Sequence, residues 1–269
     1  YRIEKLKGPP ENLPKVLHWF KWEAYTTWIS GFALMVIVYY LNASSMMLNN
    51  NGIINNPYQA ISISLIFIFF SWFIYDFLCK NFQSENQTLF VVTGFLITFF
   101  LSYILSQIYG SRAAYIHVGA IIGTIMAANV FRVIIPAQKN LVLAAENKSK
   151  PDLNLSLEAK NRSIHNNYFT LPVLFIMISS HFSFTYGNNY NWVMLAIISI
   201  AGALTRHYFN LRNRQQYKVW ILPTAALLMF LLMIVSSLPI LKKKNEIVFS
   251  SNEMITFNEV NNIIKYRCG

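Results

Sequence analysis

The chain has 269 residues, of which 55% are hydrophobic, 16% aromatic and only 12% charged. Together with repeated apolar runs of about twenty residues, these values exclude an ordinary soluble globule and are typical of polytopic helical membrane proteins. The formal net charge of +11 does not indicate a nucleic-acid partner, because the Lys and Arg residues lie in loops between the apolar runs, where they orient a chain in a lipid bilayer.

The apolar runs predict an all-α transmembrane bundle of about seven spans. In chain order the spans are expected near residues 22–41, 59–79, 88–108, 113–135, 162–182, 190–209 and 219–238. A basic segment, residues 1–21, precedes this membrane domain of residues 22–239, and a polar tail, residues 240–269, follows it.

The fourth span carries small residues at four-residue spacing, which favours the close approach of a neighbouring helix. These residues are Gly119, Gly123 and Ala127. Pro136 is expected to end the span, and a long polar loop is predicted over residues 137–161.

The fifth span has a histidine at each end, His165 and His181, and contains Pro172. The proline removes one backbone hydrogen bond, so a kink is predicted just after residues 165–167. Backbone groups freed at membrane depth need protein or a wet cavity as a partner. A polar cavity near His165 is therefore predicted, and an ordinary proline kink is the alternative.

The distribution of Lys and Arg predicts the orientation of the chain. The side that holds the N-terminal segment carries most of these cations, whereas the opposite loops carry only Arg112 before the tail. By the positive-inside rule, the first side is cytoplasmic and the tail from Leu241 onward lies outside.

This topology sorts the five histidines into two layers. His18, His165 and His207 lie at the cytoplasmic ends of their spans, and His117 and His181 lie at the outer ends. The cytoplasmic layer also gathers Glu23, Asp76, Asn129, Arg132, Asn166, Asn167 and Arg206. Ionisable groups within a bundle usually mark a site or pathway. This set offers cations and amides for a small planar anion, and histidines that transfer protons near neutral pH. The alternative is that helix-end charges simply reach to water.

The outer pair, His117 and His181, predicts a metal-binding role. Two imidazoles from facing helices can hold the iron of a haem b within a bundle. Two interfacial histidines without a ligand are the alternative. No Walker loop, dinucleotide-binding glycine pattern or nucleophile elbow occurs, so the corresponding soluble-enzyme chemistries are unsupported.

Three strings carry a resemblance to a known family. They are LPKVLHWFKWEAYTTWISGF (Leu13 to Phe32), MAANVFRVIIPAQ (Met126 to Gln138) and RSIHNNYFTLPVLF (Arg162 to Phe175). In combination they resemble the bacterial membrane-bound urate oxidases, also called urate hydroxylases, over nearly the whole chain.

The resemblance implies a membrane domain fused to a C-terminal cytochrome c domain in the bacterial inner membrane. Such a protein acts in purine breakdown, oxidises urate to 5-hydroxyisourate and passes electrons to its cytochrome on the periplasmic side. One further N-terminal span is also implied, so the chain, which begins at Tyr1, is expected to be a fragment. Cys268 and Gly269 look like the first half of a C-x-x-C-H haem-attachment motif, and the fragment is not expected to hold that haem or to be active alone.

With this resemblance, the cytoplasmic layer becomes the predicted urate site. The predicted substrate-binding residues are Arg132, Asn166, Asn167, Asn129 and Glu23. The predicted proton acceptors are His165 and either His18 or His207. Electrons are expected to cross the bundle, through a haem on His117 and His181, to the external cytochrome c.

Other functions stay open at this point. A b-type cytochrome could relay electrons from a quinol to an external cytochrome. An anion transporter could bind its solute at a broken fifth helix, although no internal repeat supports that reading. A purely structural membrane subunit is the third alternative.

Overall fold

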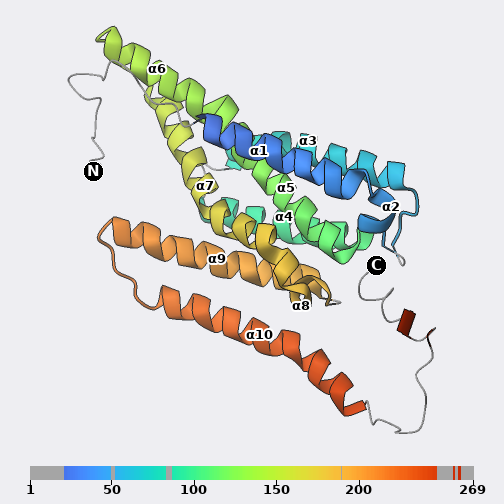
Figure 1. Ribbon diagram of the computed structural model, residues 1–269. Coiled ribbons are helices and arrows are strands. Elements are labelled where there is room, and N and C mark those ends of the chain that lie inside the picture. Colours follow the sequence, from blue (N-terminus) through green and yellow to red (C-terminus); the bar gives the residue numbers. More distant parts are fainter. Residues whose placement is uncertain are drawn as a thin grey trace.

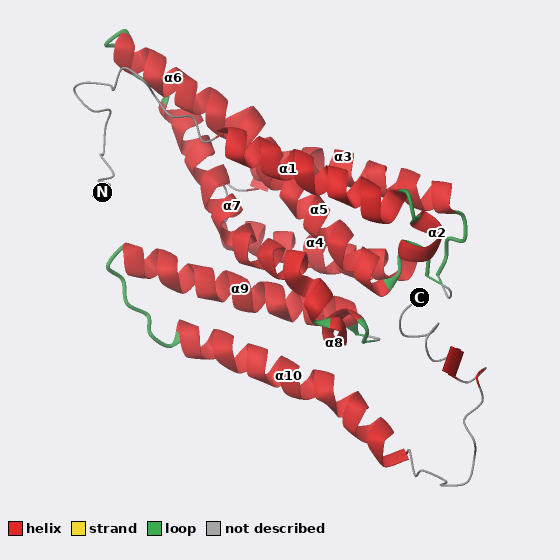
Figure 2. Cartoon of the chain, viewed as in Figure 1, coloured by secondary structure: helices red, strands yellow, loops and turns green. Residues whose placement is uncertain are grey.

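The structure is a computed structural model, and it describes residues 21–49, 52–82, 87–188 and 190–246, together with residues 257, 260 and 261. Within these ranges the chain is helical and contains no named strand (Figure 2). The predicted all-α class is therefore confirmed. The basic segment, residues 1–20, and most of the tail after residue 246 lie outside the described residues.

The elements follow one another with short connections. They are α1 (Lys21–Met35) with the π-helical turn Val36–Tyr40, α2 (Ala43–Met46), α3 (Pro57–Phe82), α4 (Gln87–Ile108), α5 (Ser111–Asn129) with the π-helical turn Val130–Ile134, α6 (Ile135–Glu146), α7 (Leu153–Ile178) with the 3₁₀ turn Ser179–His181, α8 (Ser183–Tyr186), α9 (Asn191–Asn213) and α10 (Ile221–Glu246).

Among the described residues, four helical segments are long and apolar enough to cross a membrane, judged by length and composition. They are Pro57–Asn81, Leu89–Ile108, Ser111–Glu146 and Asn191–Asn213. These segments match the second, third, fourth and sixth predicted spans. Helices α1, α7 and α10 cover the other predicted spans, and the total of seven stays a prediction.

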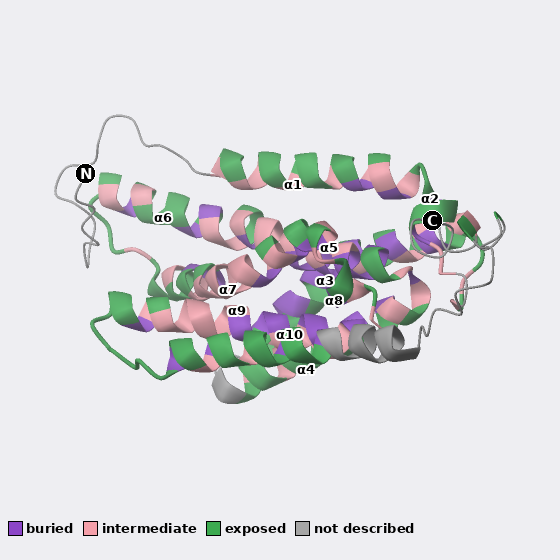
Figure 3. Ribbon diagram, turned by 60° about the horizontal axis from the view of Figure 1, so that its bottom comes forward, coloured by how far each residue is buried: buried purple, intermediate pink, exposed green. Residues whose placement is uncertain are grey.

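Helix α5 lies at the centre of the bundle. It packs against α1, α3, α4 and α7, while α9 packs against α4, α7 and α10 (Figure 1). Buried residues colour much of α5, whereas the outer side of α1 is largely exposed (Figure 3). Large apolar side chains are exposed on α3 and α4, among them Phe70 and Phe100, as expected for helix faces that meet lipid.

The predicted polar loop over residues 137–161 is wrong, and so is the predicted helix end at Pro136. Residues Ser111–Glu146 form one continuous helical segment. The π-helical turn ends with a bond from the Ile135 N–H to the Val130 carbonyl. The π-helical turn directly precedes Pro136, which lies in the first turn of α6. A missing backbone N–H costs little at that position. Asp152 then caps α7, because its side chain accepts from the backbone N–H groups of Asn154 and Leu155.

The continuous segment is longer than a bilayer is thick. Its 36 residues extend about 54 Å at the helical rise of about 1.5 Å per residue, against about 30 Å for the hydrocarbon core. Helix α6 and the beginning of α7 project together from one end of the bundle (Figure 1). The polar side chains of α3, α5 and α7 that are described first below lie where this hairpin joins the bundle.

Close approaches fix α7 between its neighbours. A Cβ added at Gly202 of α9 would lie 3.3 Å from Pro172 Cδ, and a Cβ added at Gly119 of α5 would lie 2.6 Å from Ile176 Cγ2. Pro172 is inside α7, as predicted, and is buried there. The close contact predicted for the fourth span is therefore made at Gly119, whereas nothing lies within 4 Å of a Cβ at Gly123.

Replacing Gly119 with alanine is expected to destabilise the protein by about 1 to 3 kcal/mol, because the added methyl overlaps Ile176 and forces α5 and α7 apart. Gly123→Ala is the matched control on the same helix. It is expected to be neutral or stabilising by up to about 1 kcal/mol, since alanine favours the helix and meets open space. Equilibrium unfolding in mixed micelles measures both changes. Equal effects of the two substitutions would contradict this contact.

Candidate functional site

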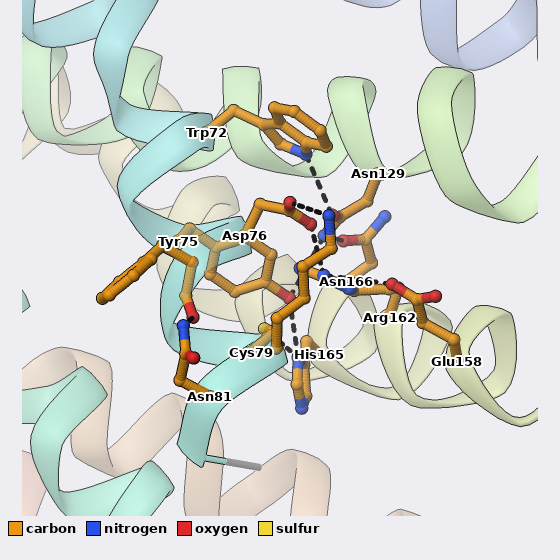
Figure 4. Close-up of polar contacts among 12 residues, drawn as sticks. Trp72, Tyr75, Asp76, Cys79, Asn81, Asn129, Glu158, Arg162, His165 and Asn166 are labelled. Carbon is orange, nitrogen blue, oxygen red and sulfur yellow. Dashed lines mark hydrogen bonds and ion pairs between the residues drawn. The ribbon is translucent and has the colours of Figure 1, made fainter. Parts of the chain in front are cut away.

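Polar side chains from α3, α5 and α7 meet inside the bundle (Figure 4). Asn129, at the end of α5, has no exposed surface. Its Oδ1 accepts from Trp72 Nε1 at 3.2 Å, and its Nδ2 donates to the Tyr75 hydroxyl at 3.3 Å and to Asn166 Oδ1 at 3.0 Å. The Asn166 amide donates in turn to the Met126 carbonyl at 3.0 Å. Both amides are thus held in one orientation.

His165 joins this set through Tyr75, whose hydroxyl lies 2.6 Å from His165 Nδ1. The imidazole stacks on Phe90, with ring centres 5.0 Å apart, and Cys79 Sγ lies 3.9 Å from the same nitrogen. A histidine whose ring orientation is held by a hydrogen bond at one nitrogen is suited to proton transfer. We call Trp72, Tyr75, Asn129, His165 and Asn166 the His165 network.

Charged side chains border the His165 network on α3 and α7. Arg162 is buried, with 1% of its side chain exposed. Its Nη2 donates to Asp76 Oδ1 at 2.5 Å and to Glu158 Oε1 at 3.3 Å. The other oxygen of Asp76 lies 2.8 Å from Lys80 Nζ. Cations and carboxylates therefore alternate along one side of the network.

A groove of about 430 Å³ lies beside these charges. It is lined by Trp72, Asp76, Lys80, Arg132, Val133, Pro136, Ala137, Asn140, Leu155 and Glu158. The Arg132 guanidinium carbon lies 5.2 Å from the Trp72 ring centre, a cation–π distance. The volume falls in the range of small-molecule sites, about 300 to 1,000 Å³.

Two predicted site residues lie in a second cluster, between α7 and α9. Asn167 Oδ1 accepts from Arg206 Nε at 2.6 Å and from Asn210 Nδ2 at 3.1 Å. The Tyr168 hydroxyl lies 2.6 Å from His207 Nδ1. We call these five residues the α7–α9 cluster. Asn166 and Asn167, predicted to act together, thus bond to different helices because neighbouring residues of a helix point to different sides.

The remaining predicted residues of the cytoplasmic layer are placed apart or not described. Glu23 is exposed on α1, where its carbonyl accepts from the hydroxyls of Thr26 and Thr27. His18 and Cys268 lie outside the described residues. The structure therefore gathers His165, Asn129 and Asn166, places Arg132 at the adjoining groove, and leaves His207 and Asn167 in the α7–α9 cluster.

His117 and His181 lie in unlike surroundings. His117 is 1% exposed, stacks on Tyr109 with ring centres 4.3 Å apart, and has its Nδ1 2.7 Å from the Ala113 carbonyl. His181 is exposed at the end of α7. One ring packed within the core and one ring at the surface do not fit a haem clamped between them. Among the described residues no group of three His, Cys, Asp or Glu side chains could hold a metal ion.

The side chains that sequence reasoning missed lie mainly on α3. Trp72, Tyr75, Asp76, Cys79 and Lys80 follow one another at spacings of three, one, three and one, which places them on one helix face. Asp76 was assigned to the cytoplasmic layer, but the helix face that these five residues share was not predicted. A polar stripe in an otherwise apolar span was the signal that could have found it.

A comparison with protein families identifies one family for this chain. A family model described as urate oxidase N-terminal matches residues 1–237. No curated protein and no solved structure matches the chain. The match includes α3, α5 and α7, which carry the His165 network.

Proposed function

Because the chain belongs to the urate oxidase N-terminal family, we propose that it oxidises urate to 5-hydroxyisourate in purine breakdown and passes the electrons to a c-type cytochrome. Membership points to a urate-related oxidoreductase. The substrate, the product and the electron acceptor are parts of the proposal.

One observation carries the proposal: a fixed histidine, two fixed amides and a groove with cations lie together where α3, α5, α6 and α7 meet, within the residues that the family model matches. Urate is a planar anion with several N–H and C=O edges. Amide side chains can match such edges, and cations can balance the charge. We place the substrate between the groove and the His165 network.

The proposed reaction joins water to urate and removes an electron pair and a pair of protons. His165 accepts a proton as the electrons leave, and Tyr75 holds the imidazole in its orientation. Asn166 binds the purine edge, and the buried Asn129, which donates to it, holds its amide in place. Arg132 lies in the groove on the Trp72 ring. This proposal assigns no role to Asn167, Glu23 and His207, which lie outside the His165 network.

A c-type haem supplies one-electron oxidation when bound, and the chain's own residues bind substrate and move protons. Cys268 is proposed as the first thiol of its attachment motif. The site is proposed to face the cytoplasm of a bacterium from the inner membrane, because the projecting hairpin carries the cations Lys139, Lys148, Lys150 and Lys160. The tail is then periplasmic.

Adding urate to the purified full-length protein is expected to reduce its c-type haem, because oxidation of the substrate must deliver electrons to an acceptor. Absorption spectra before and after addition measure this, and formation of 5-hydroxyisourate confirms turnover. A quinol, which a b-type cytochrome would oxidise, is the control reductant. Haem reduction by quinol but not by urate would refute the proposal, as would urate uptake into proteoliposomes without oxidation.

A further inference from the structure

Arg162 is a buried cation whose hydrogen-bonding capacity is mostly unused. Its side chain is 1% exposed, and only Nη2 donates to a side chain, to Asp76 and Glu158. Its Nε and Nη1 are buried and have no hydrogen-bond partner. Burying the N–H groups of a cation without acceptors costs free energy. A bound ligand could supply the acceptor that the described residues do not provide.

Space for a small ligand lies next to Arg162. A second, more open groove of about 330 Å³ is lined by Cys79, Lys80, Asn154, Leu157, Glu158, Asn161 and Arg162. It shares Lys80 and Glu158 with the groove that holds Arg132. Its volume is sufficient for a small molecule rather than for a peptide.

The charge around the two spaces favours an anion. Their lining contains three cations, Lys80, Arg132 and Arg162, but only two carboxylates, Asp76 and Glu158. Both carboxylates already bond to Arg162, and Asp76 also pairs with Lys80. The lining of the two grooves therefore carries one net positive charge, which favours an anionic ligand over a cationic one.

Tyr75 connects Arg162 to the proposed proton acceptor. The Arg162 guanidinium carbon lies 5.0 Å from the Tyr75 ring centre, while the Tyr75 hydroxyl lies 2.6 Å from His165 Nδ1. An anion bound at Arg162 thus lies one aromatic side chain away from His165. An N–H donor in the plane of the guanidinium suits an oxygen on the edge of a planar oxidised purine.

We propose that Arg162 is a substrate-binding residue of this site and that its Nη1 donates to the anionic edge of an oxidised purine. This inference rests on the proposed function, and it assigns to Arg162 the anion contact that the sequence assigned to Arg132. Arg132 then lies in the neighbouring groove, whereas the buried Arg162 contacts the ligand.

Urate binding to the full-length protein tests the inference, by equilibrium dialysis with labelled urate under anaerobic conditions. Arg162→Lys keeps the cation and its pair with Asp76 but removes the other donors. The double variant Arg162→Gln/Asp76→Asn removes both charges of this ion pair, so the Asp76 carboxylate is not left buried without its main partner. Both are expected to raise the urate Kd at least about tenfold. Arg212→Gln, an exposed charge change on α9, is the matched control and is expected to leave the Kd unchanged.

A second readout separates binding from a purely structural role. Saturating urate is expected to raise the melting temperature of the wild type and of Arg212→Gln, because a ligand that binds only the folded state stabilises it. Both Arg162 variants are expected to lose this shift. Folded Arg162 variants that keep the shift and bind urate within about tenfold of the wild type would overturn the inference but leave the proposed function intact. Absence of urate binding and turnover in the wild type would overturn both.

Discussion

Replacing His165 with glutamine is expected to lower urate turnover by about a hundredfold or more while the protein stays folded. Loss of a positioned general base typically costs about 10² to 10⁴ in rate. The glutamine amide can still form a hydrogen bond with the Tyr75 hydroxyl, so the contact at 2.6 Å has a substitute, whereas proton transfer does not. The rate of urate-dependent haem reduction in the full-length protein measures the effect.

Two further variants locate the effect. Tyr75→Phe removes the hydroxyl that orients the imidazole, so an intermediate loss of about tenfold is expected. His207→Gln changes the corresponding histidine–tyrosine pair of the α7–α9 cluster. It is expected to lower urate turnover less than either His165→Gln or Tyr75→Phe. If His207→Gln removed turnover and His165→Gln did not, the site would lie between α7 and α9 instead.

Replacing Asn129 with leucine is expected to destabilise the protein by about 2 to 6 kcal/mol. The Trp72 indole N–H and Asn166 Oδ1 both bond to Asn129, and each buried polar group left without a partner costs about 1 to 3 kcal/mol. Tyr75 keeps its bond to His165. Equilibrium unfolding in mixed micelles measures the loss, and turnover should fall as well because the amides no longer hold their positions.

Asn210→Leu is the matched control for Asn129. Asn210 donates to Asn167 Oδ1, which also accepts from Arg206, so no acceptor is left unpaired and a cost below about 1 kcal/mol is expected. A similar loss of stability in both variants would contradict the central role of Asn129.

The site could be predicted in part from the positions of polar residues in apolar spans. His165, Asn129 and Asn166 were assigned to one layer because each lies at the same end of its span, and the structure brings them together. Depth in the bundle follows directly from the count of residues along a helix. The direction in which each side chain points does not, and the structure places the contacts of Asn167 and His207 between α7 and α9.

Sequence alone determined the helical class, the positions of the long apolar helices and the family, because each depends on composition, run length or residue identity along the chain. Only the tertiary structure decided which side chains meet. Rotation of α7 sends Asn166 toward α5 and Asn167 toward α9, and the π-helical turn carries the chain through Pro136 into α6. The burial of Arg162 beside Asp76 likewise depends on how α3 and α7 pack. Such contacts are set by the packing of whole helix faces, which no local pattern of residues encodes.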